Sequence, residues 1–174
     1  WSTAIKALPP GTIIAIDGKT LRKSYHKRIE QKPLHLINAY VTGQRITIGA
    51  IKTPDKSNEI KGIPPLLKSL NIAGCVITID AMGTQKGIAN LIKMRGADYV
   101  LALKKNHKTL YRAVERLFNT ASSLNYNAML FKEDKTFDCE HSRIEHRFYR
   151  FLPIIYLPQF QKSWRGLQTI IEVR

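Results

Sequence analysis

The chain has 174 residues, enough for a single domain with a sizeable core, and 44% of them are apolar, which is ordinary for a globular protein. It contains no run of about 18 uncharged apolar residues and no signal-peptide pattern, so a membrane span is not supported and a soluble, cytoplasmic protein is expected. The 28 Lys and Arg against 13 Asp and Glu give a formal charge of +15, which favours a polyanionic partner such as nucleic acid.

The first predicted strand is the apolar run TIIAI, which leads directly into Asp17. A basic, turn-rich segment, LRKSYHKRIEQKP, separates it from the second predicted strand, LHLINAYVT. A turn at Thr42, Gly43 and Gln44 then precedes the alternating RITIGAIKT. The second and third strands should therefore form a hairpin.

A helix is predicted after the hairpin, with Ser57 as its cap. Pro64 and Pro65 are expected to kink this helix or delay its start, because proline lacks the backbone N–H of a helix interior. The predicted apolar stripe consists of Ile60, Ile63, Leu67 and Leu70.

The run CVITID predicts a fourth strand that ends on Asp80. Thr84 is expected to cap a second helix, and Gly96 to close it. The inward positions of that helix are predicted to be Ile88, Leu91, Ile92 and Met94.

DYVLALK is the fifth predicted strand, and HKTLYRAVERLFNTASS is a third helix with Leu110, Val114 and Leu117 facing inward. Beyond residue 125, YNAMLFKED, RIEHRFYRF and LQTIIEV have the composition of strands. We therefore expect a core over residues 1–124 and a β-rich insertion, or the start of a truncated C-terminal segment, over 125–174.

The predicted order β-β-β-α-β-α-β-α is a meander followed by two crossover units. Right-handed crossovers place the fourth and fifth strands parallel to the first, which gives the spatial order 3-2-1-4-5. This order predicts an α/β fold of the ribonuclease H-like kind, a mixed sheet flanked by helices with an extra β-rich segment after the core.

In that order Asp17 and Asp80 lie at the same edge of the sheet, on neighbouring strands. A carboxylate is costly to desolvate, so two at adjacent strand ends favour a site for Mg²⁺ or Mn²⁺, which prefer hard oxygen ligands. Two such ions would serve an in-line displacement at phosphate, and Gly18 and Ala81 would leave room for a phosphate backbone. The alternative is that each Asp only caps a turn after its strand.

Basic side chains follow the fifth strand at the same predicted edge. Lys104, Lys105 and Asn106 could contact DNA phosphates there, and the alternative is a solvated basic loop. The remaining candidate DNA-binding residues are Lys19, Arg22, Lys23 and Arg143.

Five ordered blocks, IAIDGKTLR, KSNEIKGIPPLL, ITIDAMGTQKGIANLI, GADYVLALKKNHKTLY and HSRIEHR, resemble those of the DDE transposases of bacterial insertion sequences, in particular the H-repeat-associated type. The resemblance implies Mg²⁺-dependent cleavage of double-stranded DNA at transposon ends and joining of the freed 3′-hydroxyls to target DNA, with Mn²⁺ as a substitute metal. It also implies a cytoplasmic, nucleoid-associated protein and a homodimer. Asp17 and Asp80 match the first two catalytic acids of that family.

The third catalytic acid departs from the family pattern. The resemblance implies a Glu on a helix in a block like H-W-x-x-E-N, and no such block precedes Arg174. Glu145 is the best candidate within the chain, although it falls on a predicted strand. The start at Trp1 and the end inside an apolar run lead us to expect a fragment. Two alternatives stay open: an inactive remnant that only binds DNA, and a nuclease on the same fold.

Overall fold

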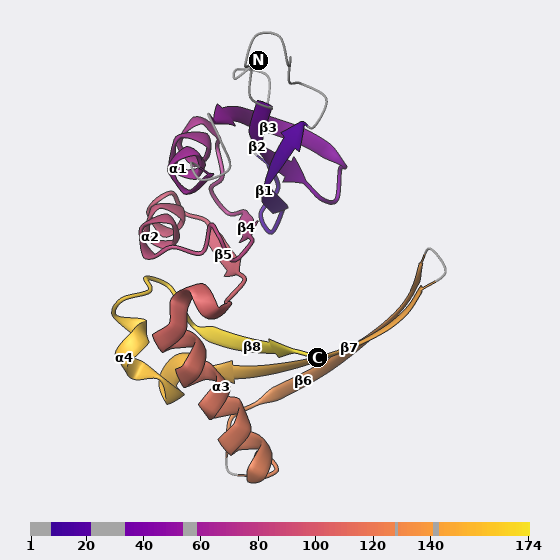
Figure 1. Cartoon of the computed structure of the whole chain (residues 1–174), viewed down its shortest axis with the longest axis vertical. Helices are drawn as coiled ribbons and strands as arrows, with labels where there is room; N and C mark the ends of the chain where they lie inside the picture. Colours follow the sequence, from indigo (N-terminus) through magenta and orange to yellow (C-terminus); the bar gives the residue numbers. More distant parts are fainter. Residues whose placement is uncertain (1–7, 22–33, 54–58, 128, 141–142) are drawn as a thin grey trace, which may run out of the picture. The chain divides into compact units, whose positions relative to one another are not determined.

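The computed structural model describes residues 8–21, 34–53, 59–127, 129–140 and 143–174. Figure 1 traces the chain through them. The chain divides into two compact units, residues 1–106 and 107–174. The sequence predicts a catalytic core that ends at residue 124. The division into compact units does not test that boundary, which stays a prediction.

The first unit is built on a five-stranded mixed sheet. Its strand order is β3-β2-β1-β4-β5, as the sequence predicts. β1 pairs antiparallel with β2 and parallel with β4, so it joins the meander to the crossover strands. The elements are β1 (Ile13–Leu21), β2 (Leu34–Val41), β3 (Ile46–Thr53), α1 (Glu59–Ser69), β4 (Val76–Ile79), α2 (Lys86–Met94) and β5 (Asp98–Leu101).

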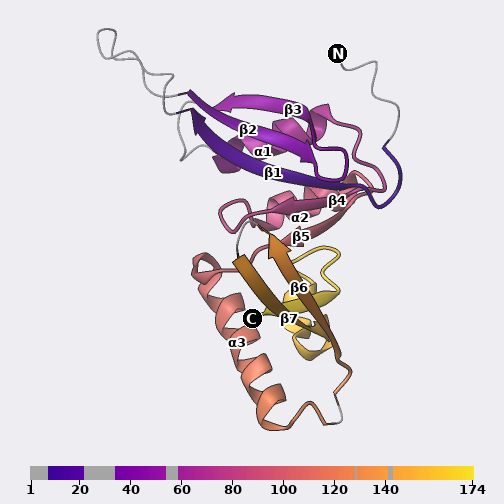
Figure 2. The same ribbon diagram turned by 90° about the vertical axis from the view of Figure 1, so that its right-hand side faces the viewer.

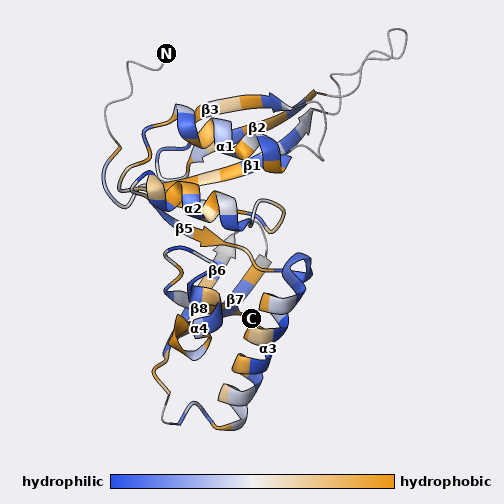
Figure 3. Cartoon of the chain, turned by 90° about the vertical axis from the view of Figure 1, so that its left-hand side faces the viewer, coloured by the Kyte–Doolittle hydropathy of each residue, from blue (hydrophilic) through white to orange (hydrophobic). Residues whose placement is uncertain are grey.

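Helices α1 and α2 cover one face of this sheet. Figure 2 shows the strands in front of both helices, and Figure 3, from the opposite side, shows the helices in front of the strands. The apolar side chains of every second strand residue point to the covered face and pack against the helices. The buried strand residues include Ile14, Ile16, Ile37, Ile77 and Ile79, and the helices contribute Leu66, Leu67, Ile88 and Ile92.

Helix α1 differs from the prediction in its start and in its buried stripe. It begins at Glu59 and runs through Pro64 and Pro65, so the prolines do not delay it, while Ser57 lies outside the described residues. Ile60 is exposed, which corrects the predicted stripe. The buried positions are Glu59, Gly62, Ile63, Leu66 and Leu67, and Leu70 packs against the core while partly exposed.

Helix α2 has a different cap from the one predicted. Its N-cap residue is Gln85, which makes no side-chain capping bond. The hydroxyl of Thr84, the predicted cap, bonds the carbonyl oxygens of Asp80 and Ala102 instead. Gly96 follows the helix with a φ of 73°, the left-handed conformation that closes helices, as predicted. Met94 is 64% exposed, so its predicted inward position is wrong.

The second unit packs a helix and a three-stranded sheet around its own core. The antiparallel sheet has the order β6-β7-β8, and β6 begins later than the run YNAMLFKED predicted. Leu110 is buried and Val114 and Leu117 are partly buried on α3, as predicted. No helix in the described parts of the chain is long and apolar enough to cross a membrane. The short helix η3 (Lys105–His107) begins in the first unit. The elements of the second unit are α3 (Lys108–Ser123), β6 (Lys132–Glu140), β7 (Arg143–Pro153), η4 (Ile154–Tyr156), α4 (Pro158–Gln161) and β8 (Thr169–Val173).

Candidate active site

Asp17 and Asp80 follow the last residue pair of a parallel ladder. Ile16 of β1 pairs with Ile79 of β4, and both strands run in the same direction. The next residue on β1 is Asp17, and the next residue after β4 is Asp80. The carboxylates therefore stand at equivalent positions on two neighbouring segments, as the strand order predicts.

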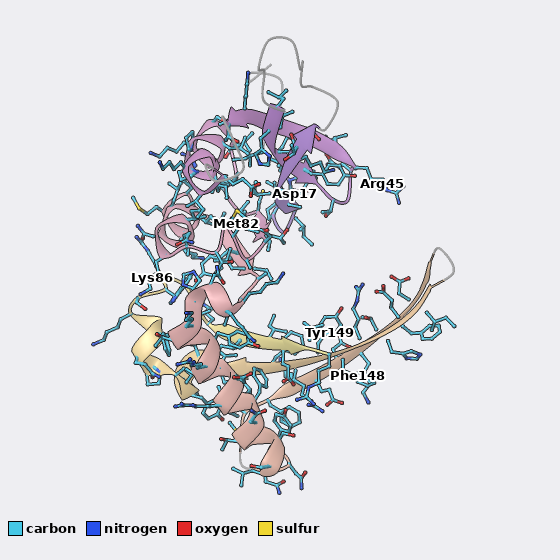
Figure 4. All side chains as sticks on the ribbon, viewed as in Figure 1. Asp17, Arg45, Met82, Lys86, Phe148 and Tyr149 are labelled. Atoms are coloured by element: carbon cyan, nitrogen blue, oxygen red, sulfur yellow. The ribbon has the colours of Figure 1, made fainter. Side chains whose placement is uncertain are left out.

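Asp17 does not end its strand, in contrast to the prediction from the sequence. β1 continues to Leu21 because β2 keeps pairing with it after β4 has stopped, and Asp17 pairs with Asn38. Both aspartates are exposed, so the cost of burying them, which the sequence argument invoked, does not arise. Figure 4 labels Asp17 on the sheet.

Asp17 projects from the face of the sheet that α1 and α2 leave uncovered. Its neighbours along β1, Ile16 and Gly18, face the helices, and side chains alternate along a strand. Asn38 lies directly across from it on β2, and Lys19 is the next residue on the same face. The sequence analysis did not identify Asn38 as a site residue. The available signal was that Asn38 is a polar residue between buried apolar residues in the strand LHLINAYV.

The Asp80 carboxylate organises the loop that follows β4. Its Oδ1 atom accepts hydrogen bonds from the backbone N–H groups of Met82 at 3.1 Å and Gly83 at 3.2 Å. This is the turn-capping role that the sequence left open as the alternative to metal binding. One oxygen serves the turn, and the second carboxylate oxygen is not used by these two bonds, so the two roles are compatible.

Two further side chains tie this loop to the end of β5. The Thr84 hydroxyl, which is buried, lies 3.0 Å from the Asp80 carbonyl oxygen and 2.8 Å from that of Ala102. The Asn106 amide donates to the Ala81 carbonyl oxygen at 2.5 Å. Asn106 was predicted as a DNA contact, and the structure gives its amide nitrogen a partner inside the protein.

The basic candidates differ in how the structure places them. Lys19, Lys104 and Lys105 are exposed in the first unit, Lys19 beside Asp17 and the others directly after β5. Arg22 and Lys23 lie outside the described residues, and Arg143 begins β7 without a described side chain. Their contacts with DNA stay predictions.

Glu145, the candidate third acid, lies on β7 in the second unit. Its carboxylate forms an ion pair with Arg147, and both side chains are close to half exposed. Hydrogen bonding by Tyr149 and then by Glu145 raises the pKa of Arg147. Glu145 is thus engaged in a surface ion pair, and its catalytic role remains a prediction.

The donor set fits a hard divalent cation in kind but is incomplete in number. Asp17 and Asp80 offer exposed carboxylate oxygens, the ligands that Mg²⁺ and Mn²⁺ prefer. Within the ranges that the structure describes, no cluster of three His, Cys, Asp or Glu side chains could hold a metal. Among the described residues, a cation at this position would thus have two candidate protein ligands, Asp17 and Asp80.

The strand order and the two carboxylates at the β1–β4 seam define a ribonuclease H-like protein. The chain belongs to the family described as the transposase DDE domain, whose model matches residues 8–159. The family resemblance of the five sequence blocks is thereby confirmed.

Two relatives from Escherichia coli are named as putative transposases. "Putative transposase YncI" of Escherichia coli K12 is 40% identical over 86% of this chain and 59% of its own length. "H repeat-associated putative transposase YhhI" of the same strain is 40% identical over 91% of this chain and 41% of its own length. The cryo-EM structure of a piggyBac transposase synaptic complex with hairpin DNA covers 95% of this chain and 33% of that chain, with a TM-score of 0.46 and 12% identity. The chain thus spans less than two thirds of the length of each of these proteins.

Proposed function

We propose that residues 1–124 form the catalytic core of a DNA transposase that cleaves DNA strands at the ends of an insertion sequence and transfers the freed 3′-hydroxyls to target DNA. The observation that carries this proposal is the register of β1 and β4, which puts Asp17 and Asp80 at equivalent positions after Ile16 and Ile79. Membership of the transposase DDE domain family supports the same chemistry.

In this proposal Asp17 and Asp80 hold Mg²⁺, for which Mn²⁺ substitutes. The ion would lower the pKa of a bound water or hydroxyl and neutralise charge on the phosphate, as metals do in phosphoryl transfer. The loop bonds of Asp80 fix one of its oxygens, which leaves the other to face the cation. Lys19, Lys104 and Lys105 are exposed and positively charged, so they would hold the DNA backbone near the two acids.

A second candidate function is that of a remnant that binds DNA without cutting it. The observation that favours it is the absence of a three-carboxylate cluster among the described residues. Glu145 stays the candidate third acid within the chain, and a Glu elsewhere in the protein is the alternative. The homodimer and the association with the nucleoid that the family resemblance implies stay predictions.

Asp17→Asn and Asp80→Asn test the proposal, because the amide keeps the size of the carboxylate and removes its charge. Each variant should lower Mg²⁺-dependent cleavage of a DNA substrate carrying the element's ends by at least about 100-fold, beyond the 10–100-fold typical of residues that only orient metal ligands. DNA affinity, measured by fluorescence anisotropy, should stay within about threefold of the unmodified protein, because the phosphate contacts remain.

Asp98→Asn is the matched control. Asp98 is an exposed carboxylate on β5 of the same sheet, and its partner is Lys93. This variant should cleave as the unmodified protein does. Cleavage that survives in Asp17→Asn or Asp80→Asn would refute the metal assignment, and DNA binding without any cleavage in the unmodified protein would establish the remnant instead.

A further inference from the structure

A buried polar cluster interrupts the apolar core of the first unit beneath β1. His35 on β2 is 2% exposed and Glu59, the first residue of α1, is 7% exposed. Both face the interior. Thr20 of β1 pairs with His35 across the sheet and lies on the same face, where it is exposed. On the covered face of the sheet, the side chains are isoleucines before the position of Asp17 along β1 and polar beyond it.

The His35 ring joins the three residues. Its Nδ1 atom lies 2.8 Å from the Thr20 hydroxyl oxygen, in hydrogen-bonding geometry. Its Nε2 atom lies 2.6 Å from Glu59 Oε1, a close polar contact that is not aligned as a hydrogen bond. The cluster therefore ties β1, β2 and the start of α1 to one another.

The Glu59 carboxylate also lies against the backbone of β1. A Cβ atom on Gly18 would collide with it, so the two are in direct contact only because residue 18 has no side chain. Gly18 is the residue after Asp17 and faces the opposite side of the strand. Glu59 thus supports the back of β1 at the place where Asp17 projects from the front.

Folding stability alone does not account for this cluster. Taking a carboxylate and an imidazole out of water is costly, and well-packed apolar residues in place of a buried ion pair are often neutral or stabilising. Polar groups of this kind are best justified where they fix a particular geometry. The geometry fixed here is the position of β1 at Gly18 relative to α1 and β2.

We infer that Glu59, oriented by His35, is a positioning residue. It holds the β1 backbone so that the Asp17 carboxylate stays at the position equivalent to that of Asp80 on the neighbouring segment. The inference rests on the proposed function, because it concerns the same two acids. Glu59 lies on the opposite side of β1 from Asp17, so it would not be a metal ligand and would act through its contact with Gly18. Residues that orient metal ligands typically contribute 10–100-fold to metal affinity, and the lower end applies to an indirect contact.

The test measures Mn²⁺ affinity by titration calorimetry in the absence of DNA. Glu59→Ala should weaken the dissociation constant about tenfold, because β1 loses its support behind Gly18. Glu59→Gln should stay within about threefold of the unmodified protein, because the amide fills the same space and its oxygen still reaches His35. An equal loss in Glu59→Gln and Glu59→Ala would overturn the positioning role and point to the negative charge of Glu59 instead.

Ile92→Val is the control for an effect of stability alone. Ile92 is fully buried on α2 in the same core, and it belongs neither to the Glu59–His35–Thr20 cluster nor to the loop that follows Asp80. The variant should lower stability by about 0.5–1.5 kcal/mol and leave Mn²⁺ affinity unchanged. A loss of affinity in Ile92→Val as large as that in Glu59→Ala would overturn the inference.

A second variant covers the case in which Glu59→Ala does not fold. Gly18→Ala pushes a Cβ against the Glu59 carboxylate and should also weaken Mn²⁺ binding. Asp17→Asn separates the two hypotheses: if the unmodified protein binds Mn²⁺ no better than Asp17→Asn, the proposed function fails. If Asp17→Asn abolishes binding while Glu59→Ala and Gly18→Ala bind normally, only the positioning role fails.

Discussion

At the scale of single residues, Thr84 holds the loop that carries Asp80. Its buried hydroxyl lies within hydrogen-bonding distance of the carbonyl oxygens of Asp80 and Ala102, which belong to the ends of β4 and β5. The sequence predicted Thr84 as a helix cap because threonine before an apolar helix is a common cap signal. In the structure the hydroxyl bonds these two carbonyl oxygens and does not cap the helix, because the two groups come close together once the sheet has folded.

Thr84→Val should lower the free energy of unfolding by about 1–3 kcal/mol, because the valine has the same shape but lacks the buried hydroxyl that bonds the loop. Urea denaturation followed by circular dichroism measures the change. Thr84→Ser keeps the hydroxyl and should lose less than Thr84→Val. Equal stability of all three proteins would mean that the hydroxyl does not support the loop.

Residues of the site were predictable where a local pattern marks them. Asp17 and Asp80 each follow an apolar strand, and strand order made them neighbours before any coordinates were known. His35 and Glu59 carried no such signal, because the contact joins a strand to a helix start 24 positions away and depends on the packing of α1. Asn38 depended on the register between β1 and β2, which the sequence did not specify.

At the scale of elements, strand order was predictable and helix faces were less so. The crossover rule specifies where β4 and β5 lie, because it follows from the handedness of the chain. The faces of α1 and α2 depend on how each helix is rotated against the sheet. Ile60 and Met94 therefore became exposed although their spacing matches a buried stripe.

Gly83→Ala and Gly87→Ala form a matched pair in and beside the Asp80 loop. A Cβ on Gly83 would collide with Ile79 Cγ2 and come within 2.7 Å of Ile63 Cδ1, whereas a Cβ on Gly87 would meet nothing within 4 Å. Gly83→Ala should lower unfolding free energy by about 1–3 kcal/mol through overpacking. Gly87→Ala, in helix α2, should be neutral or stabilising by up to about 1 kcal/mol. Equal effects in urea denaturation would contradict this account of the loop.

At the scale of the whole molecule, the positive charge is unevenly distributed. The segment 132–153, which contains β6 and β7, has five basic and five acidic residues, so the rest of the chain carries the whole excess of +15. A prediction of DNA binding from net charge therefore applies to the rest of the chain better than to this hairpin. Part of the hairpin's charge is neutralised by ion pairs, because Arg150 pairs with Glu133 of β6 and with Glu172 of β8.

DNA affinity should fall steeply as salt rises, because binding to phosphates releases counterions. Lys104→Ala and Lys105→Ala should each reduce the slope of log affinity against log salt concentration by about one. Asn106→Ala should leave the slope unchanged, since its amide is uncharged and bonds Ala81. Fluorescence anisotropy between low and physiological salt measures the slopes, and unchanged slopes in both lysine variants would remove these residues from the DNA-binding surface.

The double pairing of β1 has a consequence for how the candidate site assembles during folding. Asp17 is placed by the β1–β2–β3 meander, whose strands are neighbours in sequence, whereas Asp80 is placed by a parallel pairing to a strand more than 60 residues away. Contacts between distant segments close later and more slowly than local ones. The two acids become neighbours only when that last, non-local pairing forms, so the site exists only in the completed sheet and in no shorter folded part of it.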